Sequence, residues 1–137
     1  MLICDTSGLL ACFDTDEDDH RAVRAVIETE PGPLVVSPYV LAELDYLLAT
    51  RRGVAAEAAV LTELSGGAWQ LASCDRADVR RATEIVQRYH DQNIGLTDAS
   101  LVVLAARYRT NRLLTLDRRH FQVVHTLAGE PFSLLPG

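Results

Sequence analysis

The chain alternates between short apolar runs and longer stretches in which apolar residues recur every three or four positions. The short runs are typical of strands and the longer stretches of helices. Strands are predicted at residues 2–4, 34–36, 69–72, 113–116 and 132–135. Helices are predicted after the first strand and at residues 16–30, 38–52, 54–64, 76–90 and 99–106. Strands that are apolar on both faces and alternate with helices favour a mainly parallel sheet between helical layers, an α/β/α sandwich of three layers.

Turn and cap residues agree with this reading of the periodicity. Ser37 followed by Pro38 is typical of a helix N-cap and its first helical position. Gly53 and the pair Gly66-Gly67 stand where preceding helices should end. No stretch rich in Pro, Gly and Ser interrupts the alternation, and no internal repeat is visible. We therefore expect one α/β domain spanning residues 1–137.

Composition excludes several classes of protein. The longest uninterrupted apolar stretch, residues 101–106, is far shorter than the roughly 20 residues of a membrane span. The N-terminus lacks the basic and apolar regions of a signal peptide. The 3 cysteines have no paired spacing, which disfavours a disulfide framework or a cysteine-rich zinc site. We expect a cytoplasmic protein without membrane attachment.

Four carboxylates stand out by their positions. Asp5 and Asp117 each follow a predicted strand, Asp98 begins an apolar helix, and Glu43 lies among apolar helix neighbours. An isolated buried carboxylate is very costly unless it is paired or hydrogen-bonded. Because the ends of parallel strands lie side by side, these acids are expected to meet. The sequence therefore predicts one acidic site that needs a cation.

Each acid also has a simpler explanation. Asp5, Asp98 and Asp117 stand where helix N-caps are expected, with Thr97 as an alternative cap for the helix of Asp98. Glu43 could be a solvated residue of a helix surface, although its apolar neighbours leave it little polar face. The hypothesis of a shared site therefore rests on the four acids together.

A ligand set made only of oxygens suits Mg²⁺ or Mn²⁺, which favour phosphodiester hydrolysis. Thr6 and Thr97 adjoin the acids and are candidates to orient carboxylates or waters. Arg118 and Arg119 directly follow Asp117 and are candidates for contacts with phosphates. The four histidines show no metal-ligand spacing, and no catalytic role is assigned to them. The number of metal ions, one or two, stays open.

Charge limits the kind of partner that is expected. The formal net charge is −6, whereas nucleic-acid binders usually carry a basic surface. Any contact with a nucleic acid must therefore rely on local arginines and bound cations. All 13 basic residues are arginine. The absence of lysine excludes Schiff-base chemistry and the phosphate-binding P-loop.

Four segments together resemble the PIN-domain ribonucleases of the VapC toxin type. They read Leu-Ile-Cys-Asp-Thr-Ser at residues 2–7, Val-Ser-Pro-Tyr-Val-Leu-Ala-Glu-Leu at 36–44, Gly-Leu-Thr-Asp-Ala-Ser at 95–100 and Leu-Thr-Leu-Asp-Arg-Arg-His-Phe at 114–121. Each segment alone is weak, but their order, spacing and placement at element ends make the match specific. The resemblance covers nearly the whole chain.

The resemblance implies a parallel sheet in an α/β/α sandwich and an acidic pocket for Mg²⁺ or Mn²⁺ formed by Asp5, Glu43, Asp98 and Asp117. Asp5 and Asp98 are the direct metal ligands that it supports most firmly. It also implies the toxin of a toxin–antitoxin pair, which cuts a structured RNA such as tRNA or rRNA. The expected partners are a cognate antitoxin and a second copy of the chain in a homodimer.

Other classes fit less well. A phosphoacceptor signalling domain or a haloacid-dehalogenase-like phosphatase also places acids at strand ends. Both resemble families that need a lysine, and the phosphatase needs a second aspartate where Ser7 stands. The non-enzymatic alternative is an inactive PIN fold that serves as an RNA-binding or interaction module, but all four acids are present here.

Overall fold

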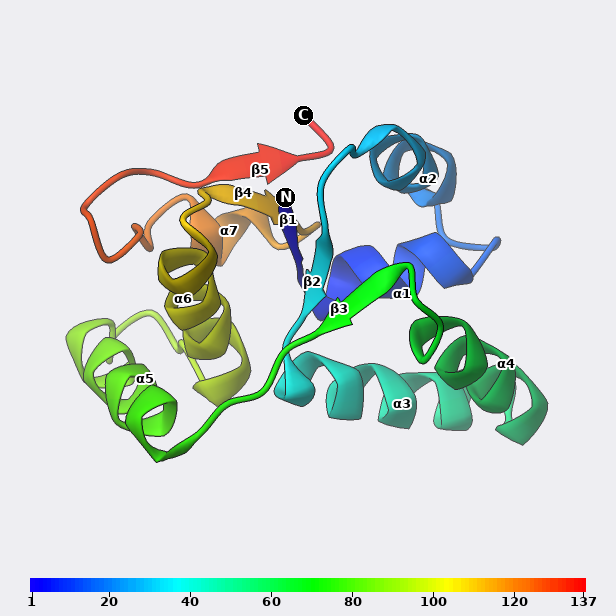
Figure 1. Cartoon of the computed structure of the whole chain (residues 1–137), viewed down its shortest axis with the longest axis horizontal. Helices are drawn as coiled ribbons and strands as arrows, with labels where there is room; N and C mark the ends of the chain where they lie inside the picture. The colour runs from blue at the N-terminus through cyan, green and yellow to red at the C-terminus, as the bar shows by residue number, and fades with distance from the viewer.

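The computed structural model describes residues 1–137 and has a parallel sheet of five strands at its centre (Figure 1). The strands are β1 (Leu2–Cys4), β2 (Leu34–Val36), β3 (Trp69–Leu71), β4 (Arg112–Leu114) and β5 (Ser133–Leu135). Their order in the sheet is β3-β2-β1-β4-β5, and every pair is parallel. In the register, Ile3 lies opposite Val35 on one side and Leu113 on the other. The predicted parallel sheet is confirmed.

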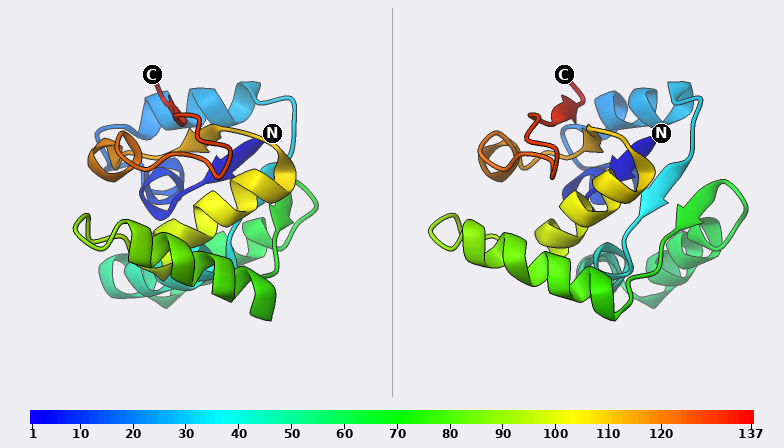
Figure 2. Two further views of the ribbon diagram at one scale, coloured as in Figure 1. Left: turned by 90° about the vertical axis from the view of Figure 1, so that its left-hand side faces the viewer. Right: turned by 60° about the vertical axis from the view of Figure 1, so that its left-hand side comes forward.

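Helices cover both faces of this sheet. They are α1 (Thr6–Phe13), α2 (His20–Thr29), α3 (Pro38–Arg52), α4 (Val54–Leu64), α5 (Arg76–Arg88), α6 (Leu96–Tyr108) and α7 (Arg118–Phe121). Figures 1 and 2 show α5 and α6 on one side of the sheet, with α1, α2 and α4 on the other. Helix α3 contacts both α1 and α6 and so links the two layers. The predicted α/β/α sandwich is confirmed.

The hydrophobic core explains the apolar run in α6. Strands β1 and β2 are buried throughout, and residues 99–105 of α6 are buried without interruption. Such a helix is apolar all round because it packs on the sheet with one side and on α5 with another.

None of the helices has the length and apolarity that crossing a membrane requires.

Two helix boundaries differ from the prediction, at the start of α2 and at the end of α5. The second helix begins at His20 instead of residue 16. Arg52 explains the difference, because one of its nitrogens lies 2.6 Å from both Asp14 and Asp16 and holds this acidic segment in a turn. The fifth helix ends at Arg88, two residues before the predicted end.

The differences close to the acidic residues have more consequence for function. Helix α6 begins at Leu96 with Gly95 as its N-cap, so Asp98 lies within the first turn and is not a cap. The strand predicted at 113–116 ends at Leu114, since the next residue, Thr115, turns its hydroxyl to Asp5. The short helix α7 was not predicted beyond a turn after Asp117.

The strand order creates a topological switch point between β1 and β4. From β1 the chain proceeds to β2 and β3 on one side, and then returns to place β4 and β5 on the other side. Open parallel sheets bind ligands in the crevice at the carboxyl ends of such neighbouring strands. Here the residues that follow β1 and β4 are Asp5 and Thr115.

Candidate metal centre at the ends of β1 and β4

Asp5 is the most buried of the four acids, with 5% of its surface exposed. Its Oδ1 accepts a hydrogen bond of 2.7 Å from the N–H of Thr6, and its Oδ2 accepts one of 2.7 Å from the hydroxyl of Thr115. Burial raises the pKa of Asp5, the two hydrogen bonds oppose this, and the charges of Asp117 and Glu43 raise it further. Asp5 is therefore both the N-cap of α1 and a member of an acidic group.

Thr115 connects the ends of the two central strands. It is fully buried, donates to Asp5, and accepts a hydrogen bond of 2.9 Å from the N–H of Asp117. Ser7 adds a second connection, because its hydroxyl accepts a hydrogen bond of 2.9 Å from the N–H of Leu116. The prediction from sequence assigned no role to Thr115. Its only signal is a single hydroxyl within an otherwise apolar run.

Asp98 points from the first turn of α6 toward the same region, with 20% of its side chain exposed. Burial raises its pKa to about 6, the charge of Asp5 adds to this, and the nearby His120 partly opposes it. The charges of Asp117 and Glu43 raise the pKa as well. All four predicted acids therefore lie within electrostatic reach of one another.

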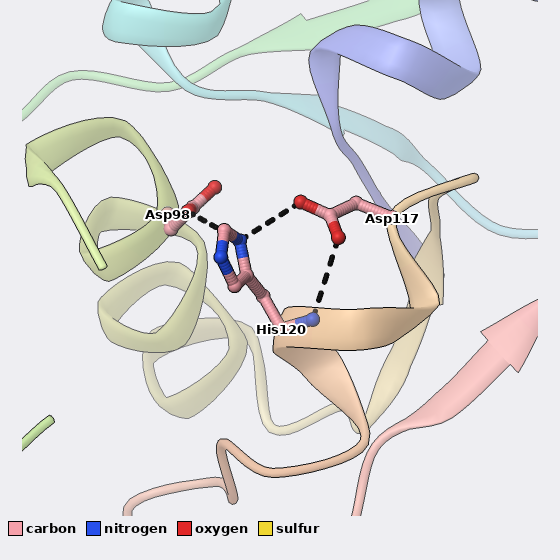
Figure 3. A group of neighbouring side chains, drawn as sticks. All are labelled: Asp98, Asp117 and His120. Carbon is pink, nitrogen blue, oxygen red and sulfur yellow. Dashed lines mark hydrogen bonds and ion pairs between the residues drawn. The ribbon is translucent and has the colours of Figure 1, made fainter. Parts of the chain in front are cut away.

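Asp117 and His120 complete the group (Figure 3). As N-cap of α7, Asp117 accepts a hydrogen bond of 3.3 Å through Oδ1 from the N–H of His120. Its other oxygen, Oδ2, lies 2.9 Å from Nδ1 of His120, and the same nitrogen lies 3.5 Å from Oδ2 of Asp98. This Nδ1 atom is buried, yet neither contact has the alignment of a hydrogen bond. It faces the two carboxylates without a directed partner.

His120 is the functional candidate that the sequence did not reveal. Its partners are the aspartates at its own helix start and at the start of α6, and not other histidines, so the spacing of histidines along the chain gives no sign of its role. The available signal was the position of His120 three residues after Asp117, which places both at the first turn of α7.

Glu43 lies on the exposed face of α3, and the prediction that it has little polar face is wrong. The buried stripe of this helix is Val40, Leu44 and Leu48, spaced by four residues, and Glu43 lies outside it. Its charge nevertheless contributes to the raised pKa values of Asp5 and Asp98. Glu43 therefore borders the acidic group from the solvent side.

The neighbouring threonines and arginines contribute differently from one another. Thr6 donates to Asp5 through its backbone, while its buried hydroxyl has no hydrogen-bond partner. Thr97 accepts a hydrogen bond from Ser100 through its carbonyl, and its hydroxyl makes no bond to a carboxylate. Arg118 donates to the carbonyl of Pro136. Arg119 makes no ion pair and lines a polar pocket beside His120.

The side chains present fit a divalent cation. One ligand atom each from Asp98, Asp117 and His120 lies within 4.8 Å of the others. Neighbouring ligands of an octahedral ion with bonds of about 2.1 Å are separated by about 3 Å, close to the 2.9 Å and 3.5 Å seen around Nδ1. Burial raises the pKa of both Asp5 and Asp98, and the charges of neighbouring carboxylates raise it further; a bound cation would oppose both effects.

A wide hollow of the molecule lies away from the acidic group. It has a volume of about 710 Å³ and lies beside the C-terminal end of α6, where Arg81, Arg109 and Leu127 are among its lining. Asp98 is at the opposite end of this helix, roughly 16 Å away at 1.5 Å per residue. No acid of the group lines this hollow.

A parallel α/β/α sandwich with carboxylates gathered at its switch point is the architecture of the PIN domain, and the PIN domain family matches residues 2–125. Ribonuclease VapC26 of Mycobacterium tuberculosis is 57% identical over 135 residues, which cover 98% of this chain and 100% of the relative. The chain belongs to the PIN-domain family, in its VapC group.

Solved structures agree on the fold. VapC20 of Mycobacterium tuberculosis, described as a toxin that cleaves the sarcin–ricin loop, superposes with a TM-score of 0.77 at 18% identity, over 82% of this chain and 87% of that one. The toxin–antitoxin complex of Klebsiella pneumoniae matches with a TM-score of 0.71 at 18% identity, over 90% and 92% of the two chains. At this level of identity the likeness concerns the fold.

Proposed function

We propose that the protein is a metal-dependent endoribonuclease that acts as the toxin of a toxin–antitoxin pair and cuts a structured RNA, tRNA or rRNA. One observation carries the proposal: Asp5, Asp98 and Asp117 converge at the switch point of a chain that is 57% identical to Ribonuclease VapC26. Phosphodiester hydrolysis needs little covalent chemistry from the protein, so a group that holds cations beside phosphate is the expected machinery.

Asp98, Asp117 and Nδ1 of His120 would hold an Mg²⁺ or Mn²⁺ ion, with Asp5 beside them. When bound, the ion supplies charge stabilisation at the phosphate and lowers the pKa of a water. Thr115 and the N–H of Thr6 hold the two oxygens of Asp5 in place. Glu43, which is exposed at the border of the group, would be the carboxylate that accepts a proton from the attacking water.

The partners follow from the same proposal. A cognate antitoxin would bind the chain, in keeping with neighbours solved as toxin–antitoxin complexes. A homodimer is expected from the resemblance to VapC toxins. The negative net charge means that RNA affinity depends on bound cations and on local arginines, so binding should weaken when the metal is removed.

The test is to map new RNA ends after incubating purified protein with total RNA and intact ribosomes in the presence of Mg²⁺ or Mn²⁺. A hairpin of the sarcin–ricin loop is the first defined RNA to include, because VapC20 is described as cleaving it. We expect discrete cuts that disappear with EDTA and in the Asp98→Asn variant. The loss expected for this variant is at least about 100-fold, since it removes a group that acts directly at the metal.

Absence of cuts in a preparation shown to be free of antitoxin would refute the nuclease. Binding of RNA without cleavage in that preparation would then identify the alternative, an inactive PIN fold that serves as an RNA-binding module. Cuts that persist in EDTA would refute metal dependence specifically. The same experiment names the RNA, which the acidic group alone does not specify.

A further inference from the structure

We propose that the polar pocket between the turn after α5 and the start of α7 binds one unpaired nucleotide of the RNA, next to the phosphate that is cut. This inference rests on the proposed nuclease function and locates part of its specificity. The pocket has a volume of about 340 Å³ and is lined by His90, Asp91, Gln92, Asn93, Arg119 and His120, with no hydrophobic residue among them.

The pocket adjoins the acidic group through a shared side chain. His120 lines the pocket, and its Nδ1 atom lies 2.9 Å from Asp117 and 3.5 Å from Asp98. The other wall is formed by residues 90–93, which lead directly into α6 and therefore into Asp98. A nucleotide in the pocket would thus lie beside a phosphate held at the acidic group.

The side-chain amides of the pocket are free for a ligand. Neither the Gln92 amide nor the Asn93 amide makes a hydrogen bond within the protein. Asn93 has a φ of 60°, the left-handed conformation that asparagine tolerates better than most residues. Ile94 is 4% exposed and anchors the turn on the core directly after it. The amide of Asn93 is therefore presented from a fixed backbone.

The chemistry of the lining matches a nucleotide. Amide side chains pair with the edges of unpaired bases, and histidine rings stack on them. The guanidinium of Arg119 is exposed and has no carboxylate partner, which leaves it for a phosphate. Asp91 is the one acid in the lining and balances the charge of Arg119, so the lining is formally neutral in a protein with a net charge of −6.

The size of the pocket favours a single nucleotide over a helical stem. Ligand pockets span about 300–1,000 Å³, and the volume of about 340 Å³ is at the small end of that range. An RNA duplex presents its base edges in a groove that side chains read poorly, whereas a loop nucleotide can be turned out into a pocket. The pocket therefore predicts that the cut lies in a loop or bulge.

The experiment compares three variants of the full chain with two controls. Asn93→Gly keeps the left-handed backbone and removes the amide, Asn93→Asp replaces its donors by acceptors, and Arg119→Ala removes the cation. The controls are Gln70→Ala on β3 at the far edge of the sheet and Arg80→Ala on α5, both exposed and without ion pairs. Total RNA is the probe, and sequencing of new 5′ ends gives the base preference around each cut.

The two kinds of contact predict different outcomes. Both Asn93 variants should relax the base preference at one position next to the cut and lower kcat/KM at the preferred sites about 10-fold, as expected for a base contact. Arg119→Ala should raise KM about equally at all sites. It should also reduce, by about 1, the slope of the logarithm of the RNA-binding constant against the logarithm of the salt concentration. The controls should match the wild type. An unchanged rise of Tm on adding Mn²⁺ shows that each variant keeps its metal site.

If the wild type cuts RNA and all three variants keep its base preferences and KM, the proposed role of the pocket is refuted and the nuclease function is not. Failure of the wild type itself to cut would instead overturn the proposed function, and with it this inference. Loss of kcat with unchanged KM in the Arg119→Ala variant would assign that residue to the cleavage step and contradict its role in binding.

Discussion

At the scale of single residues, the site is governed by how carboxylates are buried together. Asp5 is almost inaccessible, burial raises its pKa, and the hydrogen bonds that Thr115 and the N–H of Thr6 donate to its oxygens oppose this rise. Asp98 has no such donors, and burial together with the charge of Asp5 raises its pKa to about 6. Without a cation, the burial and mutual repulsion of these carboxylates therefore oppose folding at neutral pH.

Asp98→Asn should stabilise the metal-free protein while it abolishes activity. Because the folded pKa of about 6 is higher than the usual 3.8, ionised Asp98 destabilises the fold above pH 6, and stability rises as pH falls from about 6 toward 4. The variant should gain about 1–2 kcal/mol at pH 7.5 and lose this part of the pH dependence. Urea unfolding in EDTA at pH 7.5 and 5 measures both effects.

A matched control is Asp75→Asn, at an N-cap of α5 that is separate from the acidic group. Since asparagine caps helices as well as aspartate, this change should shift stability little. Millimolar Mn²⁺ should raise the Tm of the wild type and of the control, but raise that of Asp98→Asn much less. If Asp98→Asn in EDTA is less stable than the wild type, the ionised Asp98 does not destabilise the metal-free fold and this prediction is wrong.

At the scale of elements, the position of the group depends on how α3 and α6 meet. Ser37 is the N-cap of α3, and its buried hydroxyl lies 2.8 Å from the hydroxyl of Ser100 in α6. Ser100 also donates to the carbonyl of Thr97, at 2.6 Å, one residue before Asp98. This chain of hydroxyls joins the helix that carries Glu43 to the helix that carries Asp98.

Removing the two hydroxyls of this connection should lower the free energy of unfolding by less than the sum of the two single losses. Ser37→Ala loses the bond from the N–H of Tyr39 and the contact with Ser100, and should cost about 1–2 kcal/mol. Ser100→Ala should cost about 1 kcal/mol. Because the two hydroxyls share one hydrogen bond, the double variant should be less destabilised than the sum by at least about 0.5 kcal/mol. Simple additivity in urea unfolding would show that the contact is not an energetic link.

At the scale of the whole molecule, the two ends of the sheet treat buried carboxylates differently: at one end they face each other, and at the other a carboxylate is paired with cations. The carboxyl ends of the strands gather acids that repel one another. At the amino ends, the inaccessible side chain of Glu30 pairs with Arg112 of β4, with the amino group of Met1 at 2.6 Å and with the N–H of Gly32 at 3.1 Å. Burial tends to raise the pKa of Glu30, but these donors outweigh it and hold the pKa at about 2.

Acid unfolding should therefore depend on Glu30. Its folded pKa of about 2 lies below the usual 4.5, so it stabilises the fold above about pH 4.5, and this stability is lost as pH falls from 4.5 through 2. Glu30→Gln should lose about 2–3 kcal/mol at pH 7 and little at pH 2. Urea unfolding of both proteins from pH 7 to pH 2 tests this. A constant difference across that range would contradict the assignment of the pKa shift.

Local sequence signals determined the fold and part of the site. Apolar runs, the Ser37-Pro38 cap and the alternation of strands with helices predicted the parallel sandwich, because periodicity and capping act over a few residues. Asp5 and Asp117 could be predicted as neighbours, since topology alone brings the ends of parallel strands to one edge. The four matching segments indicated the PIN family, which the comparisons confirm.

Contacts between distant residues could be decided only by the tertiary structure. Thr115 reaches Asp5 across 110 positions, and the Nδ1 atom of His120 faces Asp98 because α7 docks beside the start of α6. The exposure of Glu43 depends on which stripe of α3 packs inward, and the apolar residues on both sides of it concealed this. Burial and pKa are properties of a side chain together with its neighbours in space, so the chemistry of this site emerges only when the strands and helices have packed.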